Sequence, residues 1–256
     1  MTAMVLIGWL VTAIVLALLW WRQLATRNAT SVDVAWSLSL AALTVYYAVL
    51  SDGDPLRRGM VGLLAVVWAV RLGSFLLMSR VLGEHEEDGR YQELRARWGD
   101  SAPWNFFLFY QAQAAVAVLF SLPILAAMRG GSLDGWALAG AAVWAVAVLG
   151  EGVADRQLMS FRSNPANRGE VCREGLWRYS RHPNYFFEWV HWWSYVLIGY
   201  GAPLTWIGPV VMLFFLFRVT GIPYTEAQAI RRRGDRYRAY QRTTSMFVPW
   251  FPREER

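Results

Sequence analysis

The chain has 256 residues, of which 55% are hydrophobic, and its 25 basic residues outnumber the 19 acidic ones. A soluble domain of this length is less apolar and has polar faces at regular spacing, so the composition argues against one. The single cysteine, Cys172, excludes a disulfide framework and a cysteine cage for zinc. The three histidines also lack the spacing of metal ligands, so we expect no metal site.

Seven apolar stretches are long enough to cross a bilayer, whose hydrocarbon core of about 30 Å requires roughly 20 helical residues. In chain order they cover residues 2–21, 32–50, 60–79, 104–127, 135–155, 184–202 and 204–220. An amphipathic segment at 224–243 follows the last of them. The pattern predicts an all-α, polytopic integral membrane protein with seven transmembrane helices in a single domain over residues 1–256.

All 25 basic residues are arginine, and they are distributed unevenly between the loops. If the N-terminus lies outside the cell, 21 arginines fall in cytoplasmic loops, three in outer loops, and Arg71 within a stretch. The positive-inside rule favours this orientation, with the C-terminus in the cytoplasm. Membrane lipids are expected partners of the run Arg231–Arg233. Because the basic residues continue into helices, we expect no nucleic-acid partner, and no obligate protein partner is evident.

Polar residues within the stretches all fall in the half nearer the predicted cytoplasmic side, and such residues are usually functional. They are Asp33, Arg71, Gln111, Gln113, Glu151, Asp155, Glu188, His191 and Arg218. This asymmetry predicts a polar cavity that opens to the cytoplasm. Several of these residues also have a structural alternative. Asp33 and Arg71 can form an ion pair between helices, Gln111 and Gln113 can hydrogen-bond between helices, and His191 can be a packing residue.

The segment 151–189 places six arginines beside asparagines and tyrosines. Arginine binds phosphate through paired hydrogen bonds and stacks on flat rings. No glycine-rich fingerprint follows a strand, which excludes a dinucleotide fold of the Rossmann kind. The residue chemistry therefore predicts a site for a nucleotide with several phosphates.

The sequence ADRQLMSFRSNPANRGEVCREGLWRYSRHPNYFFEW, residues 154–189, resembles the signature of bacterial membrane proteins of the DUF1295 type in the steroid 5-alpha-reductase superfamily. The likeness continues upstream in VDVAWS, WAVRLGSFLLMSR and EEDGRYQELRARWG, and downstream in RVTGIPYTEAQAIRRRGDRYRAYQRTTSMFVPWFP, so it covers nearly the whole chain. The resemblance implies a seven-helix reductase of the bacterial inner membrane that uses NADPH from the cytoplasmic side. Such an enzyme delivers hydride to the beta carbon of an enone and a proton to the alpha carbon.

The resemblance also implies which residues hold the cofactor. Carried over by position, they are Asp155, Arg162, Arg173, Tyr179, Arg181, His182, Asn184, Glu188, Arg218 and Glu226. Glu188 is expected to hold the nicotinamide amide. Arg162 and Arg173 are the candidates for the 2′-phosphate that distinguishes NADPH from NADH.

The implied catalytic residues depart from the family pattern. The steroid enzymes place a Gln-Glu pair on the second helix and a tyrosine on the third. Here the second stretch offers Asp33 and Trp36, and the third has Trp68 in about the tyrosine's register. Burial favours the neutral form of a carboxyl group, so a protonated Asp33 would donate to the substrate carbonyl. Tyr46 and Tyr110 are alternative donors. The expected substrate is a lipid-like enone, such as a 3-oxo-delta4 steroid, that enters from the bilayer.

Two other functional classes remain open. Isoprenylcysteine and phospholipid methyltransferases carry a pattern similar to RHPNY at 181–185, so a methyltransferase using S-adenosylmethionine is the alternative enzyme. Six arginines in one loop suit the phosphates of NADPH better than a sulfonium cofactor. The third class is a membrane scaffold or lipid-binding protein without enzymatic activity.

Overall fold

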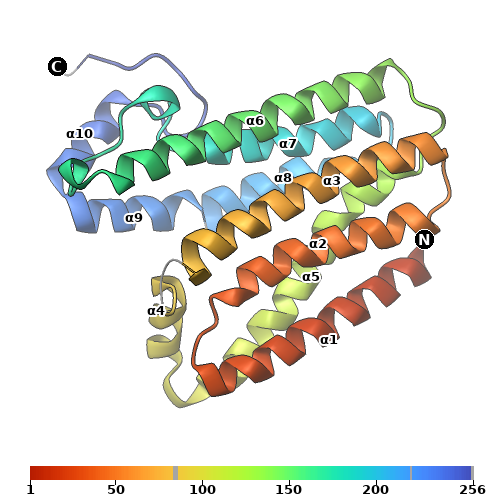
Figure 1. The fold of residues 1–256 in the computed structure, drawn as a ribbon, viewed down its shortest axis with the longest axis horizontal. Coiled ribbons are helices and arrows are strands. Elements are labelled where there is room, and N and C mark those ends of the chain that lie inside the picture. Colours follow the sequence, from red (N-terminus) through yellow and green to blue (C-terminus); the bar gives the residue numbers. More distant parts are fainter. Residues whose placement is uncertain (83–85, 220, 255–256) are drawn as a thin grey trace. The chain divides into compact units, whose positions relative to one another are not determined.

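The computed structural model describes residues 1–82, 86–219 and 221–254 of the chain (Figure 1). Helices make up 81% of the structure, and the described ranges contain no strand. This result confirms the all-α fold class.

Six helical spans among the described residues are long and apolar enough to cross a membrane. They are Thr2–Thr26, Ser31–Leu50, Pro55–Leu82, Gly89–Met128, Gly135–Ser163 and Pro203–Arg233. The spans support a multi-pass membrane protein. The seventh crossing and the orientation of the N-terminus stay predictions.

The described residues form α-helices and shorter 3₁₀ or π-helical turns. The α-helices are α1 (Thr2–Thr26), α2 (Ser31–Leu50), α3 (Pro55–Leu76), α4 (Gly89–Trp98), α5 (Ala102–Met128), α6 (Gly135–Ser163), α7 (Pro183–Ile198), α8 (Ile207–Phe214), α9 (Ile222–Arg233) and α10 (Asp235–Thr243). The shorter turns are η1 (Leu77–Leu82), η2 (Gly99–Ser101), η3 (Pro165–Asn167), η4 (Gly175–Arg178), η5 (Pro203–Trp206) and η6 (Phe215–Val219).

Several helices extend beyond the apolar stretches that predicted them. α3 begins at Pro55 rather than 60, because Asp54 caps the helix by accepting a hydrogen bond from the Arg57 backbone N–H at 3.0 Å, and proline is favoured in the first turn. α6 ends at Ser163 rather than 155. The extra turns of α6 are polar, so apolar composition alone does not reveal them.

The last two predicted stretches differ more from the structure. The stretch 184–202 forms α7, whose 16 residues are fewer than any of the six spans. The stretch 204–220 is η5, α8 and the π-helical turn η6 in succession, and its residue 220 lies outside the described residues. The amphipathic segment 224–243 is divided into α9 and α10 at Gly234, whose φ of 53° is a left-handed conformation that suits glycine.

The described residues form two compact units. Unit 1 comprises residues 1–133 and 202–207, and unit 2 comprises residues 134–201 and 208–256 as far as they are described. The single domain over residues 1–256 stays a prediction.

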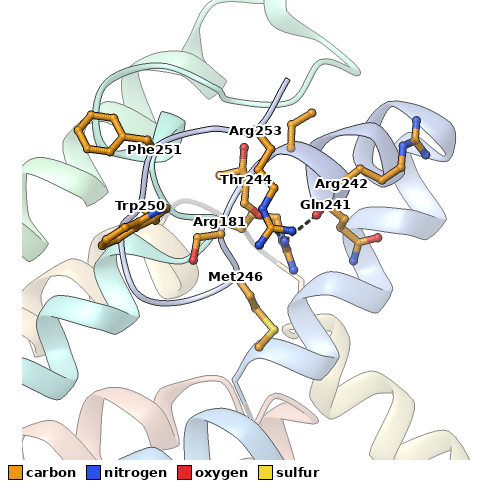
Figure 2. Close-up of a pocket in the computed structure, with 10 residues that line it drawn as sticks. Arg181, Gln241, Arg242, Thr244, Met246, Trp250, Phe251 and Arg253 are labelled. Atoms are coloured by element: carbon orange, nitrogen blue, oxygen red, sulfur yellow. Dashed lines mark hydrogen bonds between the residues drawn. The ribbon is translucent and has the colours of Figure 1, made fainter. Parts of the chain in front are cut away.

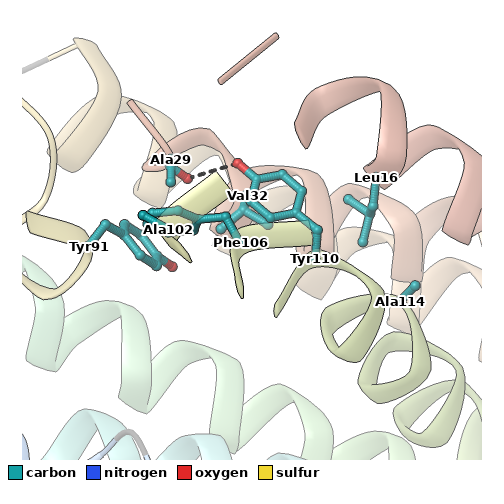
Figure 3. Packing of buried hydrophobic residues seen from close by; sticks show 8 residues of the cluster. All are labelled: Leu16, Ala29, Val32, Tyr91, Ala102, Phe106, Tyr110 and Ala114. Carbon is teal, nitrogen blue, oxygen red and sulfur yellow. Dashed lines mark hydrogen bonds between the residues drawn. The ribbon is translucent and has the colours of Figure 1, made fainter. Parts of the chain in front are cut away.

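The core of unit 1 lies where α1, α2 and α5 meet, and α4 packs on it (Figure 3). Leu16, Val32 and Phe106 are fully buried there. Tyr110 of α5 is also fully buried, and its hydroxyl group donates a hydrogen bond to the Ala29 carbonyl at 3.5 Å. Tyr91 attaches α4 to this core.

The core of unit 2 is the pair α6 and α7, which run side by side (Figure 1). Two glycines of α6 allow the close approach. A Cβ atom on Gly140 would lie 2.7 Å from the Ser194 carbonyl oxygen and 2.5 Å from the Ile198 side chain. A Cβ atom on Gly150 would lie 2.5 Å from the Phe187 ring. The contact at Gly140 is the more restrictive, since it involves backbone atoms.

We expect Gly140→Ala to lower the free energy of unfolding by about 1–3 kcal/mol, because overpacking forces backbone shifts. The measurement is the thermal unfolding of the detergent-purified protein. Gly59→Ala in α3 is the control, since a Cβ atom there meets nothing within 4 Å. Equal midpoints for the two variants would contradict close packing of α6 on α7.

Candidate functional site

The loop that precedes α7 is fastened to α6. The Leu176 backbone N–H donates to the Gln157 side chain at 2.9 Å, and the Trp177 indole donates to the Ala154 carbonyl at 2.9 Å. Gly175 has a φ of 55°, and a Cβ atom on it would overlap the Gln157 side chain. Glycine is therefore needed for the loop to lie this close to the helix.

The same loop is joined to residues 244–253, which we call the C-terminal segment. Ser180 donates from its hydroxyl group to the Phe247 carbonyl at 2.8 Å, and the Arg181 backbone N–H donates to the Ser245 carbonyl at 2.8 Å. The Trp250 backbone N–H donates to the Tyr179 carbonyl at 2.9 Å. These bonds give loop and segment a defined backbone geometry.

Arg181 is buried between the loop and the C-terminal helices. Its Nε donates to Glu226 Oε1 at 2.6 Å, and its Nη1 donates to the carbonyls of Thr244 at 2.6 Å and Gln241 at 3.1 Å. The guanidinium group is thus used within the protein, which makes Arg181 a positioning residue.

Glu226 is the centre of a polar cluster. Besides Arg181, it accepts a hydrogen bond from the Gln241 side chain at 2.8 Å, and the Nε2 atom of His182 lies 3.3 Å from Glu226 Oε1. The His182 ring stacks on Tyr185, with centroids 5.3 Å apart. Burial lowers the pKa of His182 below its usual value, and this effect exceeds the opposing influence of Glu226. His182 is therefore neutral in the folded protein at pH 7.

A neutral, buried His182 predicts that stability falls in mild acid. Below about pH 6.5 the histidine of the unfolded chain binds a proton that the folded chain does not bind, so each pH unit costs up to about 1.4 kcal/mol. We expect the thermal midpoint to drop between pH 7.5 and 5.5, and to drop less in His182→Gln. Parallel curves for the two proteins would contradict a depressed pKa.

A second polar contact joins α6 to α7, where the Asn184 side chain donates to Asp155 Oδ1 at 3.2 Å. Within α7, Glu188 accepts from the Trp192 indole at 3.1 Å. Asp155 and Glu188 are both buried. Both side chains can form hydrogen bonds in buried surroundings, where such bonds are stronger than in water.

Other arginines of the loop face outward. Arg173 and Arg178 are exposed and line a pocket of about 370 Å³ together with Arg253. The Arg173 guanidinium lies 5.5 Å from the centre of the Tyr240 ring. Tyr179 is also exposed, and its ring meets the edge of Phe251. No carboxylate lines this pocket among the described residues, so it suits an anion.

Unit 1 holds a separate charged cluster around Asp33. The carboxylate accepts from Arg80 Nη1 at 2.9 Å, from Arg90 Nη2 at 2.6 Å and from the Tyr91 hydroxyl group at 2.6 Å. Asp33 forms an ion pair, as the structural alternative predicts, but its partners are Arg80 and Arg90 rather than Arg71. Both carboxylate oxygens accept hydrogen bonds within the protein, which argues against Asp33 as a group free to donate to a substrate.

The profile of one protein family, described as a protein of unknown function (DUF1295), matches residues 19–244. The chain belongs to the DUF1295 family. No curated protein and no solved structure matches it. In this DUF1295 protein the matched range includes every candidate site residue, from Asp33 to Glu226.

The DUF1295 protein keeps its candidate residues in groups. All the candidate cofactor residues belong to unit 2, and Asp33, Tyr46, Trp68 and Tyr110 belong to unit 1. The structure joins Arg181, His182 and Glu226 directly, and it joins Asp155 to Asn184. Arg162 and Arg218 are exposed and line neither of the two described pockets.

The other three candidate catalytic residues, like Asp33, have surroundings of their own within the protein. Trp68 is fully buried, and the Tyr46 ring lies 5.6 Å from that of Tyr47. The hydroxyl group of Tyr110 donates to a backbone carbonyl, whereas the hydroxyl group that reaches Asp33 belongs to Tyr91. Sequence reasoning missed Tyr91, which stands on the polar helix α4.

Proposed function

We propose that this DUF1295 protein is a membrane reductase that uses NADPH. Bound NADPH would supply a hydride for the beta carbon of a conjugated carbon–carbon double bond. The proposal rests on the resemblance of residues 154–189 to the steroid 5-alpha-reductase superfamily. The observation that carries it is the pocket lined by Arg173, Arg178 and Arg253, because guanidinium groups without an opposing carboxylate fit phosphates.

Within this proposal the chain's residues have distinct roles. Arg173 and Arg178 would bind phosphate, and Arg162 is a further candidate. Arg218 is a candidate cofactor residue only because of the family resemblance. Arg181, His182 and Glu226 would hold the loop in shape, since their polar atoms bond one another.

The side chains of Asn184 and Glu188 suit the nicotinamide end of NADPH. Asn184 and Glu188 carry an amide and a carboxylate that complement a carboxamide group. Since Asp33 is paired with two arginines, Tyr91 is the added candidate for polarising the substrate carbonyl. A preorganised donor in a site without water stabilises a developing enolate.

The proposal includes seven crossings, with the N-terminus outside and the cofactor side facing the cytoplasm of a bacterium. The substrate would be a lipid-like enone, such as a 3-oxo-delta4 steroid, entering from the bilayer. The apolar spans and the uneven distribution of arginine support this arrangement.

Cofactor binding tests the proposal. The detergent-purified protein is titrated with NADPH, NADH and S-adenosylmethionine while thermal stability is followed, because a ligand that binds the folded state raises the midpoint. We expect the largest rise with NADPH, and a smaller rise in Arg173→Gln/Arg178→Gln. Arg97→Gln, an exposed arginine of α4, is the control. A rise with S-adenosylmethionine alone would favour the methyltransferase.

A further inference from the structure

The C-terminal segment presents apolar side chains to the outside. Met246, Val248, Trp250 and Phe251 are 37%, 53%, 69% and 75% exposed. Phe247 points the other way: it is buried, and its ring packs against neighbouring aromatic rings. The segment therefore has one buried side and one exposed apolar side, as an extended chain at an interface does.

The exposed rings are held in place. The backbone N–H of Trp250 bonds to Tyr179, and the backbone N–H of Arg253 donates to the Thr243 carbonyl at 2.8 Å. These bonds anchor the backbone at Trp250 and at Arg253, with Phe251 between them. Large apolar side chains on a fixed backbone form a patch that a loose tail would not, and such patches mark interaction sites.

A cationic pocket adjoins the patch. It measures about 310 Å³, and its lining includes Trp250, Phe251, Arg242 and Arg253. Figure 2 shows Trp250 and Phe251 on one side and Arg242 on the other. No carboxylate lines the pocket, and within the described residues neither Arg242 nor Arg253 forms an ion pair. Arg181 also lines it, but its guanidinium group is already bonded to Glu226.

The segment lies beside the ends of apolar helices. The Phe247 ring is 5.7 Å from Trp189, in the first two turns of α7, and 5.2 Å from Phe217 of η6. η6 belongs to the candidate span Pro203–Arg233. A patch beside the end of a membrane-spanning helix would meet the headgroup region of a bilayer, where tryptophan and arginine are both favoured.

We propose that the C-terminal segment docks on an anionic phospholipid surface. Arg242 and Arg253 bind a headgroup phosphate in the pocket, while Trp250 and Phe251 enter the boundary between headgroups and acyl chains. A phospholipid surface fits the site because its phosphates complement the arginines and its acyl chains complement the adjoining apolar rings. A soluble anion would use only the arginines. Arg253 lines both this pocket and the proposed NADPH pocket, whereas Arg242 lines only this one and Arg173 and Arg178 only the other. Arg242 therefore distinguishes this inference from the proposed function.

Native mass spectrometry of the full chain tests the proposal with phosphatidylglycerol and phosphatidylcholine. We expect phosphatidylglycerol to bind more tightly. Arg242→Gln/Arg253→Gln should weaken that binding roughly 25-fold, since each surface arginine contributes about fivefold. Trp250→Ser/Phe251→Ser should weaken binding of both lipids. Arg97→Gln/Arg168→Gln removes two exposed arginines that line neither pocket and is the matched control.

Each contrary result has a defined meaning. Equal loss in the control variant would mean that overall charge attracts the lipid, and would overturn the site. Displacement of phosphatidylglycerol by millimolar glycerol phosphate, with no effect of Trp250→Ser/Phe251→Ser, would indicate a simple phosphate site and also overturn the docking surface. A thermal midpoint equal to that of the wild-type chain without ligand shows that Arg242→Gln/Arg253→Gln is folded. Unchanged NADPH-induced stabilisation in Arg242→Gln, whose residue lines only the pocket of about 310 Å³, separates this inference from the proposed function.

Discussion

Replacing Glu226 by alanine is expected to destabilise the protein by about 3–5 kcal/mol, because it leaves the buried Arg181 guanidinium without its counter-charge. The Glu226 side chain is 14% exposed and the Arg181 side chain 9% exposed, so water compensates little. The alanine also removes the acceptor of the Gln241 and His182 side chains. The measurement is the free energy of unfolding in detergent, read from denaturant or thermal curves.

The control is Glu170→Ala. Glu170 pairs with Arg236, and the two side chains are 47% and 61% exposed. An exposed pair of this kind contributes about 0–1 kcal/mol. If both alanine variants lost the same small amount, the Arg181–Glu226 pair would not hold the loop.

The second large effect is expected at Asp33. Asp33→Ala should destabilise unit 1 by about 2–4 kcal/mol, because two guanidinium groups and a buried phenol lose their common acceptor. Asp33→Asn keeps the shape but loses the charge, so its cost should be intermediate. Unfolding curves of the two variants give the comparison with the wild-type chain.

A double-mutant cycle with Arg90 separates a structural role from a catalytic one. The coupling energy between Asp33→Asn and Arg90→Gln should be about 1 kcal/mol or more if the pair stabilises the fold. Asp235→Ala, which breaks the exposed contact with Arg238, is the control. Full stability of Asp33→Asn, with loss of substrate reduction, would restore Asp33 as the proton donor.

Much of the fold follows from local sequence. Runs such as residues 2–21 and 104–127 are too apolar for any soluble element, and α1 and α5 contain them completely. The boundaries are less accessible. Asp54 and Pro55 start α3 by capping chemistry, which a search for apolar length ignores. The sequence predicts a longer helix than α7, because the GYGAP that follows it is only weakly polar.

The site is only partly visible in sequence. Six arginines in one segment predict anion binding, but not which arginines are already bonded within the protein. The partner of Arg181 lies 45 residues later, and only the tertiary fold brings it near. At Asp33, depth in the membrane suggested Arg71. Arg80 reaches the carboxylate because the π-helical turn η1 continues α3, and no apolar pattern predicts that continuation.

The bonds from Ser180 and Arg181 to Phe247 and Ser245 have a consequence for biosynthesis. The partner of Ser180 is translated 67 residues later, which takes roughly 3–13 seconds at ordinary elongation rates. Throughout that interval the nascent loop lacks the backbone carbonyl that Ser180 bonds in the folded protein. Maturation of this half of the protein is therefore completed late, and ribosome pausing before residue 247 would prolong exposure of the loop to quality-control proteases.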